Sequence, residues 1–176
     1  MKNALLFLSV LWLGACATHI VPPYSIHHGN TAGLRTSKAP EVSLGRFDAF
    51  AGADLTPTCA GGTVVTADGS SLADYLRKAF VDELTMADKY NPKSPLVLSA
   101  TITELAYSAA DNRWNLALVV RSNNGKSLAV VEEYSFQTDH TGETACIQAA
   151  NAFLLAVQAL IGKTFSHEEF SELLVM

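Results

Sequence analysis

Charged side chains are scarce in this chain. Asp, Glu, Lys and Arg make up 16% of the 176 residues, with 12 basic against 17 acidic residues and a formal net charge of −5. Without a basic excess there is no electrostatic field to gather phosphates, so the composition argues against a nucleic-acid partner. Apolar residues reach 49%, which leaves apolar surface for a protein partner or a lipid.

The common sequence motifs of catalysis and metal binding are also missing. Gly61-Gly62 lacks the lysine and the spacing of a phosphate-binding loop, so we expect a turn there. There is no Gly-x-Ser-x-Gly nucleophile elbow. A hydrolase site would have to be built around Asp139 and His140, for which helix capping is the simpler role. The sequence therefore predicts no enzyme and no cofactor.

Cysteine is rare, and the first of the three cysteines closes an apolar N-terminal run. Lys2 supplies a short positive region, an apolar stretch covers 4–13, and small residues precede Cys16, as in a secretory signal peptide. The run is shorter than the about 20 residues that cross a bilayer. Leu13-Gly14-Ala15-Cys16 resembles the lipobox of bacterial lipoproteins, whose cysteine is joined to diacylglycerol and acylated, for example with palmitate. We therefore expect signal peptidase to remove residues 1–15 and Cys16 to carry the lipid.

Cys59 and Cys146 form the remaining cysteine pair, in a chain expected to be exported to an oxidising compartment. A disulfide is the natural prediction, and two separate buried thiols are the alternative. A disulfide would close the loop between residues 59 and 146, which on the chain-entropy model stabilises the fold by about 4–5 kcal/mol. No metal site is expected, because no histidine lies at ligand spacing from either cysteine.

Residues 16–40 contain Pro22-Pro23 and His27-His28-Gly29-Asn30 and show no sustained hydrophobic period. Such a composition is typical of a linker. We therefore predict a flexible lipidated tether over 16–40, with a reach of about 25–30 Å, followed by a periplasmic α+β domain over 41–176.

Hydrophobic periodicity within this domain predicts two helices, over 71–89 and 142–163, with a terminal helical turn near the C-terminus. Period-two alternation predicts strands over 41–50 and 96–107, the latter with a phase slip near Glu104. Two further strands complete the pattern. The order β-α-β-β-β-α predicts an α+β fold: an antiparallel sheet of about four strands with two helices packed on one face.

The last two strands are expected to form a hairpin around Asn123-Asn124-Gly125-Lys126. With Gly125 in the left-handed region, Val120 opposes Leu128 and Trp114 opposes Tyr134, so their side chains share one face. The opposite face of the hairpin is more apolar than solvent requires. It is a candidate interaction face for the tether, a partner or a lipid, and an ordinary Val-rich strand surface is the alternative. Its residues are Ala117, Val119, Ala129 and Val131.

The order of these segments resembles that of a known lipoprotein family. A lipobox at Cys16 precedes a Pro-containing tail, a helix opened by Ser71-Leu72-Ala73-Asp74-Tyr75-Leu76, a strand at Pro95-Leu96-Val97-Leu98, the Trp114 hairpin and a tail at His167-Glu168-Glu169-Phe170. The pattern is similar to the YajG family of small Gram-negative lipoproteins, and more loosely to the auxiliary lipoproteins of ABC-type transport systems. The cysteine pair at 59 and 146 has no counterpart in that pattern.

This resemblance implies a non-enzymatic lipoprotein of the cell envelope. It would bind an envelope protein or a lipid, as an accessory module of an envelope complex such as a transport system. A structural, self-associating or lipid-binding lipoprotein is the alternative. Ala17, where inner-membrane lipoproteins carry Asp, resembles the sorting pattern of outer-membrane lipoproteins. The expected location is therefore the outer membrane, with the lipid anchor facing the periplasm.

Overall fold

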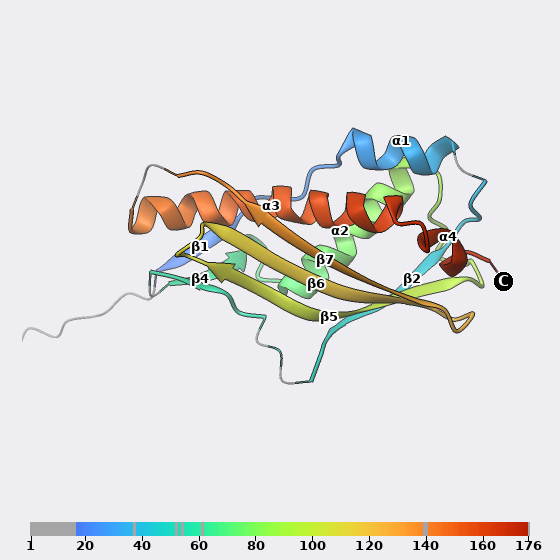
Figure 1. The fold of residues 1–176 in the computed structure, drawn as a ribbon, viewed down its shortest axis with the longest axis horizontal. Coiled ribbons are helices and arrows are strands. Elements are labelled where there is room, and N and C mark those ends of the chain that lie inside the picture. Colours follow the sequence, from blue (N-terminus) through green and yellow to red (C-terminus); the bar gives the residue numbers. More distant parts are fainter. Residues whose placement is uncertain are drawn as a thin grey trace, which may run out of the picture.

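The computed structural model describes residues 17–36, 38–51, 53, 55–60, 62–138 and 141–175. These residues form an α+β fold, the predicted class, shown in Figure 1. The elements in chain order are β1 (Thr18–Val21), α1 (His28–Thr36), β2 (Ser43–Ala49), β3 (Thr58–Cys59), β4 (Gly62–Thr66), α2 (Leu72–Met86), β5 (Val97–Ser108), β6 (Arg113–Ser122), β7 (Ser127–Ser135), α3 (Glu143–Ser166) and α4 (Phe170–Leu173).

The larger sheet has four strands in the order β2-β5-β6-β7, and β5, β6 and β7 form an antiparallel meander. Val120 pairs with Leu128 and Trp114 pairs with Tyr134, so the predicted hairpin register is confirmed. The register of β5 shifts between Ile102 and Glu104, where the sequence predicts a phase slip. Gly125 adopts the left-handed conformation, with φ of +90°, and the turn that it makes possible fixes the register between β6 and β7.

One edge of this sheet corrects the sequence prediction. β2 runs parallel to β5, not antiparallel, with Ser43 opposite Val97 and Leu44 opposite Leu98. A parallel pair needs a crossover connection, and α2 lies on that connection. Side-chain alternation tells which face a residue occupies but carries no information on strand direction, so the sequence pattern did not reveal this edge.

A second, three-stranded sheet has the order β1-β4-β3. β1 runs parallel to β4, whereas β3 and β4 are antiparallel neighbours. The sequence analysis assigned the residues of β1 to a flexible tether. Their side chains alternate instead between exposed and buried, with His19 and Val21 inside.

The tether prediction is therefore corrected for residues 17–36, which form β1 and α1 and pack on the domain. Polar contacts to α2 and α3 replace the hydrophobic period that the segment lacks. The Tyr75 hydroxyl donates to the carbonyl of Pro22 at 3.1 Å, the Gln158 amide donates to that of Ser25 at 2.7 Å, and the Asn30 amide donates to that of Gln158 at 2.9 Å. These partners lie far away in sequence, so local composition could not indicate them.

The helices α2 and α3 cover one face of the larger sheet, and α1 packs against both of them. Ser71 caps α2 by accepting a hydrogen bond from the Asp74 amide at 3.0 Å, as expected for a capping residue. Aromatic side chains join the layers: Phe153 of α3 contacts Trp114 of β6, with ring centroids 4.8 Å apart. The Trp114 indole also donates to the Ala149 carbonyl at 2.8 Å.

α3 has the length and composition of a membrane-spanning helix, with a mean hydropathy of 1.7 over its most apolar window. Half of that window is buried inside the domain, and Ala149, Phe153 and Val157 are completely buried. A core helix covered by a sheet passes the same test, and the packing of α3 is that of a core helix.

Candidate functional site

The predicted interaction face lies on the side of the β6–β7 hairpin that points away from α3. Ala117 pairs with Val131, and Val119 pairs with Ala129, so the four residues form one contiguous group. Val131 is 52% exposed, Ala129 is exposed and Val119 is half-buried, whereas Ala117 is almost covered. We call this group the hairpin patch.

Polar contacts border the hairpin patch at both ends. Arg121 donates to the Thr101 hydroxyl at 2.8 Å on one side, and Arg113 approaches Glu133 at 3.2 Å on the other. An apolar centre within a polar rim is the usual anatomy of a protein interface. The patch is small, and its backbone is held rigid by the meander.

The exposed edge of β7 is blocked by α3. The Lys163 amine donates to the backbone carbonyl of Val131 and lies 3.5 Å from a carboxylate oxygen of Glu132. Glu132 lies opposite Leu116, and this ion pair explains its half-buried position. A lysine on an edge strand discourages pairing with another strand, so a partner would contact the face of the hairpin and not its edge.

The predicted disulfide between Cys59 and Cys146 is present, with Cα atoms 5.6 Å apart. It joins β3 to the first turn of α3. A cavity of 390 Å³ lies beside it, lined by residues of the β3–β4 turn, the β5–β6 turn and the segment leading into α3. The bond therefore fastens β3 to the start of α3 at one end of the molecule, beside the β5–β6 turn.

A buried carboxyl group on α2 anchors the N-terminal segment. Glu83 is fully buried, and one of its oxygens accepts hydrogen bonds from the Tyr24 hydroxyl at 2.6 Å and the His27 backbone amide at 2.8 Å. Its other oxygen has no hydrogen-bond partner among the described residues. Burial, together with the hydrogen bond to Glu83, raises the pKa of Tyr24 far above its ordinary value.

Sequence reasoning missed Glu83, although a signal for it existed. The residue continues the apolar stripe of α2 after Leu76, Ala79 and Phe80, at helical spacing. A charged residue on the buried face of a helix needs a polar partner. That partner is the N-terminal segment, so the contact serves the fold and offers no open binding site.

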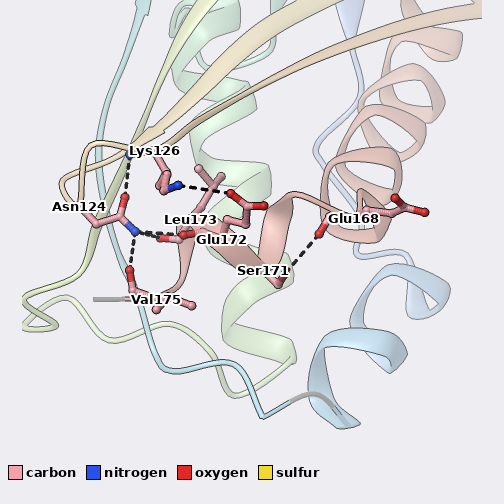
Figure 2. Close-up of polar contacts among 7 residues, drawn as sticks. All are labelled: Asn124, Lys126, Glu168, Ser171, Glu172, Leu173 and Val175. Carbon is pink, nitrogen blue, oxygen red and sulfur yellow. Dashed lines mark hydrogen bonds and ion pairs between the residues drawn. The ribbon is translucent and has the colours of Figure 1, made fainter.

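A polar cluster lies at the end of the molecule away from the disulfide, where the β6–β7 turn meets α4 (Figure 2). The side-chain amide of Asn124, in the β6–β7 turn, donates to the carbonyls of Glu172 and Leu173 at 3.1 and 3.2 Å. Lys126 lies 3.6 Å from Glu172. These contacts fasten the hairpin tip to α4 and the C-terminal residues, so their role is structural.

The signal segment 1–15, Cys16, Gly61, Asp139 and His140, all discussed from the sequence, lie outside the described residues. Within the described ranges, no group of three or more His, Cys, Asp or Glu side chains is arranged to hold a metal ion. The structure thus places the cysteine pair and the hairpin patch, and leaves the lipid site as a prediction.

No protein-family model matches the chain, and no curated protein matches it either. Among solved structures, the chain is similar to a crystal structure described as that of an uncharacterized protein. The two share 11% identity at a TM-score of 0.47, over 85% of this chain and 100% of the other. A likeness at this level carries no argument on fold or function.

Proposed function

We propose that the protein is a lipoprotein anchored through Cys16 in the outer membrane and facing the periplasm. Its domain would act without covalent chemistry, as a binding or accessory module for an envelope complex such as a transport system. The N-terminal signal and Leu13-Gly14-Ala15-Cys16 support the anchor. The disulfide agrees with export to an oxidising compartment.

The exposed hairpin patch is the observation that carries the binding role. Val131 exposes 52% of its surface and is contiguous with exposed Ala129 and half-buried Val119, and it is contiguous exposed apolar surface that marks an interaction site. The blocked β7 edge and the polar rim leave the patch as the accessible apolar part of this sheet. We assign its partner as an envelope protein, which would cover the patch with its own apolar side chains.

Crosslinking in cells tests the binding role. The lipidated protein carrying Val131→Asp is compared with the wild type and with Ser127→Asp, which adds the same charge on the same face of β7 outside the patch. Mass spectrometry of the crosslinked, detergent-extracted material should show one envelope protein with the wild type and Ser127→Asp, and its loss with Val131→Asp. Thermal unfolding should be similar for all three proteins.

Two results would contradict this role. Equal recovery of the partner with Val131→Asp would exclude the hairpin patch as its site. Recovery of the protein's own copies alone, or of lipid alone, would favour the structural or lipid-binding alternative.

Processing tests the anchor separately. We expect Cys16→Ser to accumulate as an uncleaved precursor without acyl mass, whereas the wild type gains the mass of the lipid and loses residues 1–15. Normal processing of Cys16→Ser would show that the N-terminus is not a lipoprotein signal.

A further inference from the structure

Ala17, the residue directly after the proposed lipid site, already contacts the domain. The backbone amide of Thr63 donates to the carbonyl of Ala17 at 3.1 Å, and Thr18 pairs with Thr63 in the parallel β1–β4 ladder. The contact is tight: a Cβ added at Gly62 would lie 2.5 Å from the Ala17 oxygen. β1 is therefore seated in its sheet from its first residue.

The chain between a lipid on Cys16 and the first residue of the domain is therefore only one residue step long. Cys16 is bonded to Ala17, and consecutive Cα atoms are about 3.8 Å apart. A flexible tether over 16–40 would let the domain stand off by tens of ångströms, but residues 17–36 are occupied in β1, α1 and their contacts. A lipid on Cys16 must therefore hold the start of β1 close to the headgroups.

Several turns gather at the same end of the domain as the start of β1 (Figure 1). Cys59 pairs with Gly62 at the end of β4 where Ala17 lies. The cavity beside the disulfide connects this turn with the β5–β6 turn and the start of α3. We call this region the proximal end; six of the residues that line its cavity are Cys59, Ala60, Ala109, Asn112, Gly142 and Cys146.

The surface of the proximal end exposes several small or apolar side chains. Ala60, Ala109 and Ala110 are exposed, small and uncharged. Ile147, next to the disulfide on α3, exposes 50% of its surface. Two exposed carboxylates also lie at this end: Glu143 in the first turn of α3, and Asp111 in the β5–β6 turn, which lies 3.8 Å from the Arg113 side chain that also contacts Glu133.

We propose that the proximal end rests on the bilayer surface in the lipidated protein. This inference rests on the proposed function, because it requires lipid on Cys16. α3 starts at the proximal end and runs along the long axis of the molecule (Figure 1). Its 24 residues span about 36 Å, so the Asn124–Glu172 end is held at least that far along the molecule, away from the headgroups.

Photo-crosslinking to lipid tests this orientation. A benzophenone-bearing phenylalanine replaces Ala110 in the β5–β6 turn or Lys126 in the β6–β7 turn, which are exposed positions at opposite ends of β6. The lipidated proteins are reconstituted in vesicles of phosphatidylethanolamine and phosphatidylglycerol, irradiated and weighed by mass spectrometry. We expect a phospholipid adduct at position 110 and none at position 126.

A third protein tests whether the adduct at position 110 comes from the short connection to Cys16 or from an affinity of the proximal end for lipid. A Gly/Ser linker of about 20 residues between Cys16 and Ala17 has an end-to-end distance of about 25 Å, and it should abolish the adduct at position 110. Persistence of the adduct with this linker would overturn the short connection as its cause.

The same mass spectra distinguish the two proposals. Absence of lipid mass on Cys16 would overturn the lipoprotein assignment and this inference with it. Lipid on Cys16 with no adduct at position 110, or with equal adducts at both positions, would overturn the orientation alone.

Discussion

The Tyr24 hydroxyl donates a hydrogen bond of 2.6 Å to the buried Glu83 carboxyl, across 59 residues of sequence. Together with the His27 amide on the same oxygen, it joins the N-terminal segment to α2. The connection from β1 to α1 is thereby part of the folded domain.

Loss of this hydrogen bond should destabilise the domain. We expect Tyr24→Phe to lower the free energy of unfolding by about 1–3 kcal/mol, because it leaves a buried acceptor with one donor fewer. Tyr90→Phe is the matched control, since Tyr90 is also half-buried. Urea unfolding of the domain measures both. An equal decrease in the free energy of unfolding for the two variants would show that the hydrogen bond to Glu83 does not contribute to stability.

Because of the same contact, alkaline pH should destabilise the domain. Burial and the hydrogen bond to Glu83 raise the pKa of Tyr24 in the folded state, whereas an unfolded tyrosine has a pKa of about 10. The folded state therefore keeps the proton longer, and stability is lost as the pH rises above about 10. Tyr75, whose pKa is also raised by burial, contributes in the same direction.

The pH dependence can be assigned to Tyr24 by substitution. Unfolding free energy measured from about pH 8 to pH 11 should fall less steeply for Tyr24→Phe than for the wild type, with the remaining slope due in part to Tyr75. Identical slopes would contradict this assignment.

A methyl group at Gly62 should displace β1. The Cβ of Gly62→Ala would lie 2.5 Å from the Ala17 oxygen and 2.7 Å from the His19 ring, so we expect lower stability and faster proteolysis of residues 17–27. Gly33→Ala is the control, because its Cβ meets nothing within 4 Å and alanine favours a helix by up to about 1 kcal/mol. A stable, protease-resistant Gly62→Ala would show that β1 is not packed this closely.

The disulfide should supply much of the domain's stability. On the chain-entropy model, closing a loop of 87 residues is worth about 4–5 kcal/mol. The double variant Cys59→Ser, Cys146→Ser should therefore unfold at much lower urea concentration than the oxidised wild type. Reductant should move the wild type toward the double variant and leave the variant unchanged; a wild type insensitive to reductant would contradict the prediction.

Local signals in the sequence predicted the features that depend on neighbouring residues. Gly125 and the alternation on either side of it gave the correct β6–β7 register, and hydrophobic periodicity located the two long helices, α2 and α3. The pairing of Cys59 with Cys146 followed from their being an even pair in a chain expected to be exported.

Features that depend on distant partners were not predictable in this way. β1 and α1 lack a hydrophobic period because Glu83, Tyr75 and Gln158 bind their backbone from far along the chain. The parallel direction of β2 depends on the path of α2, which alternation does not encode. At the hairpin patch, the sequence identified the four residues but not the lysine that blocks the edge beside them.

The contact of β1 with α3 has a consequence for biogenesis. β1 packs against α3, so in the exported lipoprotein proposed above the end next to Cys16 could not be completed until α3 had crossed the inner membrane. The long-range contacts that finish a fold form late and leave apolar surface open meanwhile. We expect the emerging N-terminal half, with an unpaired Cys59, to depend on periplasmic chaperones and thiol oxidants until translocation ends.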